Sequence, residues 1–149
     1  MGNPYGKTAL TATITLPNLD KYLEKVEAAG NNIDDACKEA VNAATPIVYK
    51  TMKEGAARHR KGAGKYGTDA VYNAIEANPA KQNGNFIYGT IGIDMEKHPK
   101  AKSGVYEEYG DGHSPEFPDP FVRPAFDDHK KEIRAAERAV LKKKGVPVD

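Results

Sequence analysis

Residues 85–94, NFIYGTIGID, form the stretch that decides the fold. Its side chains alternate with a period of two, which predicts a β-strand. Ile87, Gly89, Ile91 and Ile93 fall on one side of this strand. Glycine leaves space beside the backbone, so we expect a helix or another strand to approach this strand closely.

The neighbouring strands follow from the same pattern. Asn83-Gly84 precedes the first strand, and this dipeptide is the strongest short indicator of a β-hairpin. It predicts a partner strand near Ala74–Gln82, following a segment, Asp69–Glu76, that suits a short helix or the start of that strand. Threonine alternates with apolar residues over Thr8–Leu16, which predicts a third strand, and Val105–Tyr109 is a candidate fourth.

Two helices are expected between the strand at Thr8–Leu16 and the hairpin. Asn18 can cap a helix over Leu19–Ala29. A longer helix begins near Ile33, because small and apolar residues recur there every three or four positions. Pro46 should kink this helix, which we expect to fade near Met52–Ala57.

A last helix is expected from Pro124 to Lys144, ended by Gly145 and Pro147. Its predicted apolar stripe consists of Phe126, His129, Ile133, Ala136 and Val140. Strands and helices do not alternate along the chain as parallel βαβ units would. The predicted fold is therefore α+β: a small, mostly antiparallel sheet of three or four strands, with two N-terminal helices and a C-terminal helix packed on it.

The composition fits one domain over residues 1–149, with flexible ends at residues 1–7 and 145–149. The chain has one cysteine, Cys37, which excludes an internal disulfide, and its flanks predict the buried face of a helix. The net charge of +1 gives no global attraction to nucleic acid or anionic membranes. No apolar run approaches the ~20 residues that span a bilayer, and the start lacks the zones of a signal peptide.

Residues 104–126, GVYEEYGDGHSPEFPDPFVRPAF, contain four prolines and separate the sheet from the last helix. Proline fixes φ and removes a backbone donor, so we expect residues 104–125 to form a stiff, mostly extended arm. Apolar side chains lie between the prolines, which predicts that the arm packs against the core or a neighbouring molecule.

This arm resembles the end of the tail-completion, or head–tail joining, proteins of long-tailed bacteriophages. Their pattern Y-x-E-x-G-T … PFLRPA is matched by Tyr106, Glu107, Glu108, Tyr109 and Gly110, and then by Pro120, Phe121, Val122, Arg123, Pro124 and Ala125. Asp111 stands where the family usually has threonine, and Val122 stands for leucine.

The resemblance implies a structural virion protein, not an enzyme, that assembles in the host cytoplasm. It would form a ring, usually six-fold, at the neck or tail end of the phage, although such proteins are often monomers until they meet their partner. Its partners would be other copies of itself, the head connector, and tail tube or tail terminator proteins, with DNA passing nearby and no membrane or cofactor involved.

Two charged segments are candidate contact surfaces. Residues 53–65 carry five Lys or Arg, and the glycine-rich part, residues 55–68, is expected to be a mobile basic loop. Glu107–Asp119 carries five acids and no Lys or Arg. The residues expected at an interface are Arg58, Arg60, Lys61, Lys65, Glu107, Glu108, Asp111, Glu116, Phe117, Phe121 and Arg123. Those expected to shape the arm are Tyr106, Gly110, Pro120, Pro124 and Phe126.

Other chemistry has little support in the sequence. The acidic segment lacks the spacing of a Ca²⁺ loop, and His113 alone does not make a zinc site, so we expect no metal and a solvated or partner-facing acidic stretch. The histidines and serines show no catalytic spacing. The basic segment could face solvent, an acidic protein or DNA, and the alternative function is therefore a small, non-specific nucleic-acid-binding protein that uses Lys53–Lys65.

Overall fold

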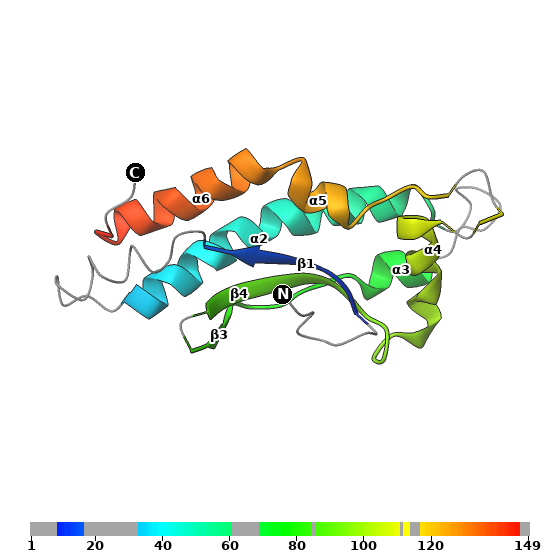
Figure 1. Ribbon diagram of the computed structural model, residues 1–149, viewed down its shortest axis with the longest axis horizontal. Helices are drawn as coiled ribbons and strands as arrows, with labels where there is room; N and C mark the ends of the chain where they lie inside the picture. Colours follow the sequence, from blue (N-terminus) through cyan, green and yellow to red (C-terminus); the bar gives the residue numbers. More distant parts are fainter. Residues whose placement is uncertain are drawn as a thin grey trace.

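Figure 1 shows the computed structural model, in which α2 (Ile33–Ala57) runs along the length of the molecule beside a sheet. The structure describes residues 9–16, 33–60, 69–84, 86–110, 112–113 and 117–146. The helix predicted over Leu19–Ala29 and the two flexible ends lie wholly or largely outside these residues. Within them, the arrangement is α+β, as the sequence predicts.

The sheet is antiparallel and centred on β4 (Phe86–Asp94). β1 (Ala9–Thr15) pairs with β4 along its whole length, in a register that places Ala12 opposite Ile91. β2 (Glu76–Ala77) and β3 (Lys81–Asn83) pair with successive parts of β4. The strands predicted around residues 8–16, 74–82 and 85–94 are thereby confirmed.

The partner strand is split into β2 and β3 at Asn78-Pro79. Asn78 bonds to Thr90 of β4 through both its backbone N–H and its side-chain amide. Pro79 has no N–H to give to the sheet, so regular pairing stops there and resumes at Lys81. The hairpin follows as predicted: Asn83 pairs with Phe86, and Gly84 adopts a φ of 62°, a conformation that favours glycine.

The glycines of β4 bring the backbone close to its neighbours. A Cβ at Gly89 would lie 2.9 Å from Cγ1 of Val41, so α2 could not pack at this distance against a larger residue. A Cβ at Gly92 would clash with the carbonyl oxygen of Leu10 in β1. The predicted close approach is confirmed on both a helix and a strand.

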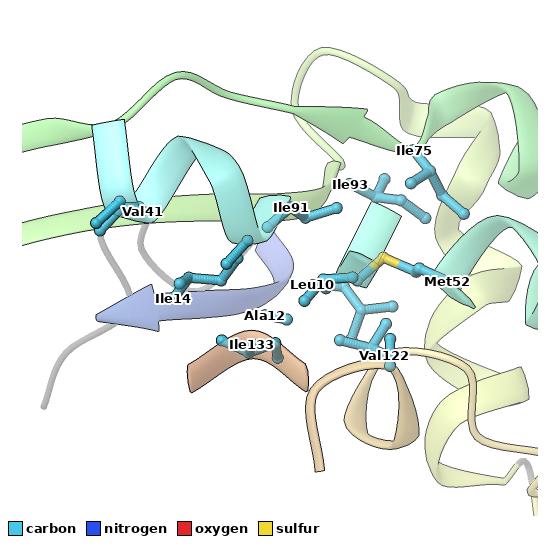
Figure 2. Close-up of a cluster of buried hydrophobic side chains, with 14 of the residues drawn as sticks. Leu10, Ala12, Ile14, Val41, Met52, Ile75, Ile91, Ile93, Val122 and Ile133 are labelled. Atoms are coloured by element: carbon cyan, nitrogen blue, oxygen red, sulfur yellow. The ribbon is translucent and has the colours of Figure 1, made fainter. Parts of the chain in front are cut away.

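The core lies between the sheet and α2. In Figure 2, Leu10, Ile14, Ile91 and Ile93 from the strands and Met52 from α2 meet in one cluster, which further residues of the chain complete. α2 continues as a helix through Pro46, which lies on its exposed face, and does not fade before Ala57. Residues 55–57, predicted as loop, are thus the end of this helix.

Cys37 lies on the buried face of α2, as predicted. Burial raises the pKa of its thiol to about 11, with smaller contributions from the negative charges of Asp34 and Glu137. The thiolate form is therefore disfavoured at neutral pH, and the side chain behaves as a small apolar group.

The start of the predicted arm is helical instead of extended. After α3 (Asp69–Ala74) and β4, a 3₁₀ turn, η2 (Pro99–Lys102), leads directly into α4 (Ser103–Tyr109). Val105–Tyr109 is therefore not a strand. The prolines that restrict the arm begin only at residue 115, and the VYEEY sequence before them can form hydrogen-bonded turns.

The last helix is two helices, not one: α5 (Arg123–Asp127) and α6 (Lys130–Lys143). The N–H of His129 bonds to the carbonyl of Phe126, three residues back, and its φ of −125° leaves the helical range. Along the two helices, Ile133, Glu137 and Leu141 are buried, and Phe126 and Val140 are half-buried against the core. The predicted stripe therefore holds for Phe126, Ile133 and Val140 but omits Glu137 and Leu141.

The C-terminal end of α6 follows the prediction. Gly145 has a φ of 78°, and the N–H of Val146 bonds to the carbonyl of Leu141, which satisfies an end carbonyl. Among the helices that the structure describes, none is both long and apolar enough to cross a membrane.

Candidate functional site

The polar groups of the arm gather where α4, residues 117–122 and the start of α5 meet the end of α2. We call this region the α4 corner: Arg58, His59, residues 106–110 and residues 117–123. Figure 1 places α4 at one end of the elongated molecule, far from the β3–β4 hairpin. The corner brings together residues about 60 positions apart in the chain.

Glu108 is the centre of the corner, with a fully buried side chain. Its Oε1 accepts hydrogen bonds from the backbone N–H groups of Phe121 and Val122, both at 2.8 Å. Its Oε2 accepts the backbone N–H of Arg123 at 3.0 Å and the guanidinium Nε at 2.8 Å. The carboxylate thus caps the N-terminus of α5 from another helix, where a negative charge is favourable.

Arg123 returns a further bond, from Nη2 to the backbone carbonyl of Glu108 at 2.7 Å. Burial alone would raise the pKa of Glu108, but the hydrogen bonds from Val122, Arg123 and Phe121 outweigh burial and lower it. Glu108 is therefore ionised at neutral pH and bound on both oxygens.

Asp119 joins the arm to the end of α2. Its carboxylate forms a two-bond pair with Arg58, at 2.8 and 2.9 Å, and His59 Nε2 lies 2.7 Å from its Oδ2. Arg58 also donates to the carbonyl of Pro120. The hydrogen bond from Arg58 is the largest cause that lowers the pKa of Asp119, partly opposed by burial.

Glu107 lies beside this pair and is only 3% exposed. Its Oε1 has no hydrogen-bond partner among the residues that the structure describes, although its backbone carbonyl accepts the N–H of Asp119. Burial, together with the negative charge of Asp119, raises the pKa of Glu107 to about 7, against a smaller lowering by Arg58.

A pH-dependent stability follows from Glu107. Its folded pKa, about 7, exceeds the ordinary value of 4.5, so its contribution is fully present below pH 4.5 and is lost as pH rises through 7. Glu107→Gln imitates the protonated form. The variant should therefore be more stable than the wild type at pH 8, by on the order of 2 to 3 kcal/mol, and should lose this advantage near pH 5.

Urea unfolding at several pH values measures this difference. Glu54→Gln, at an exposed glutamate of α2, is the matched control and should leave the profile unchanged. Identical pH profiles for the wild type and Glu107→Gln would contradict the buried, protonated glutamate.

Glu137 is a second buried glutamate, on the face of α6 that packs against α2. Its Oε1 accepts Arg134 Nη1, which also donates to the carbonyl of Thr15 in β1. Burial raises the pKa of Glu137 to about 7, although Arg134 lowers it in part. Glu137 and Arg134 thus connect α6 to Thr15, the last residue of β1.

The described part of the basic segment, residues 53–60, is more ordered than predicted. Arg58 and His59 form a turn after α2 and bind Asp119, and Arg60 Nε donates to Asp69 at 3.0 Å. Lys53 donates to the carbonyl of Tyr72 and lies over its ring. Lys61 and Lys65 lie outside the described residues.

Two of the described acids in the acidic segment depart from the solvated or partner-facing stretch that the sequence predicts. Glu107 and Glu108 are buried, and Asp119 is bound to Arg58. An acidic run looks exposed in sequence, yet here two of its members point into the protein because α4 turns one face inward. Asp111 and Glu116 lie outside the described residues.

The remaining arm residues support the corner. Phe121 is buried, Phe117 is half-buried with its ring 5.1 Å from that of His59, and Phe126 is half-buried. Gly110 has a φ of 89° and ends α4 against Pro118. Pro124 occupies the first turn of α5, where its missing N–H is not needed.

Two aromatic residues of the corner face solvent. Tyr106 is 52% exposed and Tyr109 is 61% exposed, and with Phe86 they are the exposed large apolar side chains of the described part of the chain. The guanidinium of Arg123 lies 4.9 Å from the ring centre of Tyr109. The outer surface of the corner therefore carries two exposed tyrosines and the half-exposed cations Arg58 and Arg123.

Sequence reasoning did not find three residues of these sites: His59, Arg134 and Glu137. His59 and Asp119 are 60 positions apart, so no local spacing could have linked them. Glu137 and Arg134 are three apart on a helix, a spacing that permits a pair but does not show which face is buried.

No group of His, Cys, Asp and Glu in the described part of the chain has the arrangement of a metal site. Comparisons of the chain with models of known protein families, with curated proteins and with solved structures found no match.

Proposed function

We propose that this chain is a structural assembly subunit of the neck or tail end of a long-tailed bacteriophage, where it forms a ring that helps to join head and tail. One observation supports the proposal most directly. The two halves of the string that resembles the tail-completion proteins, Tyr106 to Gly110 and Pro120 to Ala125, are bound to each other through Glu108 and Arg123.

This contact gives the resemblance a physical reason. Glutamate at position 108 and arginine at position 123 are needed together, because each carries hydrogen-bonding groups that the other satisfies inside the corner. The corner that results holds Tyr106 and Tyr109 on its outer surface. Aromatic residues and arginine are enriched where proteins meet.

A ring needs a contact between two different surfaces of identical subunits, repeated until it closes. The α4 corner is the surface that we propose for one side of this contact. The other partners would be the head connector and the tail tube or terminator proteins, with no cofactor, in the virion and during assembly in the host cytoplasm.

The mass of the protein in solution and negative-stain images test the ring. The wild type should form closed rings of one diameter, whereas the double variant Tyr106→Ser, Tyr109→Ser should keep the wild-type melting temperature but fail to assemble. Phe86→Ser, which removes the exposed aromatic residue on β4, is the matched control and should still assemble. A wild type that stays monomeric both alone at its highest soluble concentration and when mixed with neck and tail-end partner proteins would contradict the ring.

The alternative, nucleic-acid binding through Lys53–Lys65, has less support. Arg58 is bound to Asp119 and Arg60 to Asp69, so acids within the chain offset two of its cations. A phosphate would have to compete with both carboxylates. Non-specific affinity depends on cations that are free to neutralise phosphates, and this segment offers fewer of them than its sequence suggests.

A further inference from the structure

The outer face of α6 carries a row of cations that the proposed assembly role does not use. Lys131, Arg138 and Lys142 are exposed, while Ile133 is buried on the opposite face. We call these three residues the α6 basic row. Ala135 and Ala139, exposed beside the row, are small and uncharged, and Glu132 is the exposed acid next to Lys131.

Helix geometry places the three cations on one line. They are seven and four residues apart, and at ~100° per residue their directions agree within about 40°. At a rise of ~1.5 Å per residue, they span about 16 Å along the helix. Figure 1 shows α6 along the outer edge of the molecule, beside α2, with its far side uncovered by any labelled element.

The members of the row make no ion pair within the described residues, and neither does Lys143, whereas Lys130 and Arg134 of α6 and the following Lys144 do. Arg134 is bound to Glu137, Lys130 lies 3.8 Å from Asp127, and Lys144 lies 3.3 Å from Glu39. Glu132, the exposed acid of this helix, pairs with His129. Three positive charges in a straight row therefore remain uncompensated.

Helix stability does not explain the row. Lysine in the last turn is favourable because of the negative end of the helix dipole, which accounts for Lys142. Lys131 lies in the first turn, where the same dipole opposes a positive charge. This position of Lys131, together with the small exposed side chains of Ala135 and Ala139 beside the row, favours a negatively charged ligand.

The composition of this face distinguishes between two kinds of ligand. Protein interfaces are enriched in aromatic residues and depleted in lysine, and the exposed residues of α6 are lysine, arginine, alanine and one glutamate, with no aromatic residue. Interfaces with nucleic acids are positive and polar. Single strands bind by stacking on aromatic side chains, which this face lacks, so a duplex fits better.

We propose that the α6 basic row binds the phosphate backbone of double-stranded DNA without reading its sequence. This surface differs from the predicted basic loop, whose Arg58 and Arg60 are already bound to acids. The inference does not rest on the ring, because a monomer also carries the row.

Fluorescence anisotropy with a labelled duplex of mixed sequence tests the inference, at several salt concentrations. The triple variant Lys131→Glu, Arg138→Glu, Lys142→Glu should weaken binding at low salt by tenfold or more. Each phosphate contact contributes ~0.9 to the slope of log affinity against log salt, so the neutral triple Lys131→Gln, Arg138→Gln, Lys142→Gln should reduce the slope by about 2 to 3.

The matched control reverses three exposed lysines outside α6: Lys50→Glu, Lys100→Glu and Lys102→Glu. It changes the net charge equally and should bind nearly as the wild type does. Three outcomes would overturn the inference: no duplex binding by the wild type, equal losses in the two reversal variants, or equal competition by polyglutamate, which would favour an acidic protein partner. Circular dichroism melts verify that all variants fold.

Discussion

Glu108→Ala should lower the free energy of unfolding by about 3 to 5 kcal/mol, because it removes the buried partner of several donors at once. The backbone N–H groups of Phe121, Val122 and Arg123 would lose their acceptor. Each buried donor left unsatisfied costs about 1 to 3 kcal/mol, and the first turn of α5 would lose its cap. Urea denaturation monitored by circular dichroism measures the loss.

The opposite truncation gives a sharp comparison. Arg123→Ala removes the half-exposed partner of the pair but leaves the three backbone donors bound to Glu108, so its cost should be clearly smaller. Glu96→Gln, at an exposed glutamate, is the control and should change stability by less than about 0.5 kcal/mol. Equal losses for Glu108→Ala and Arg123→Ala would show that the salt bridge, not the capping of α5, supplies the stability.

The sheet and its helix could be predicted because their determinants are local. The alternation in residues 85–94, the Asn83-Gly84 turn and the spacing of apolar residues in α2 each specify an element from its own neighbours. Even the close packing of α2 on β4 follows from one residue, Gly89, because glycine is the residue that leaves room for it.

The α4 corner could be predicted only in part because its contacts are not local. The PFVRPA string marks a special backbone, but nothing near it shows that Glu108 supplies the acceptor. An acidic run such as Glu107-Glu108 is usually solvated. Its burial here depends on α4, which the sequence pattern presented as a candidate strand, and on donors 13 to 15 residues further along.

The prediction for the last helix is incomplete in two respects. It assumes a continuous helix from Pro124, whereas the backbone leaves the helical range at His129. Within α6, it includes Ile133 and the half-buried Val140 but omits the buried Glu137 and Leu141. Apolar periodicity could not indicate a buried glutamate in this stripe. Glu137 is held there by Arg134, which also donates to the carbonyl of Thr15 in β1, a contact distant in the sequence.

Phe121→Ala should be among the most destabilising single substitutions in the chain, at about 3 to 5 kcal/mol. Phe121 is 2% exposed and packs in the core between the arm and α2. Its truncation removes a large apolar surface and leaves a cavity that the backbone, bound to Glu108, cannot easily fill. Phe86→Ala, at an exposed phenylalanine, is the control and should cost less than about 1 kcal/mol; similar melting temperatures for both variants would contradict the packing of the arm.

The residue that faces Phe121 predicts a further asymmetry. A Cβ at Gly55 of α2 would lie 2.8 Å from Cβ of Phe121 and 3.3 Å from its Cα, so Gly55→Ala should cost about 1 to 3 kcal/mol. Alanine at position 121 keeps both of these atoms. Phe121→Ala should therefore not rescue Gly55→Ala, and the double variant should be less stable than either single variant.

Gly104 of α4 is the matched control, because it is also a buried glycine in a helix. A Cβ there would lie 3.5 Å from the nearest side-chain atoms, an ordinary contact, and alanine favours a helix over glycine by about 0.5 to 1 kcal/mol. Gly104→Ala should thus be neutral or stabilising, while Gly55→Ala is destabilising. If thermal melts gave both substitutions the same sign, the close contact between the arm and α2 would not be the reason for glycine at position 55.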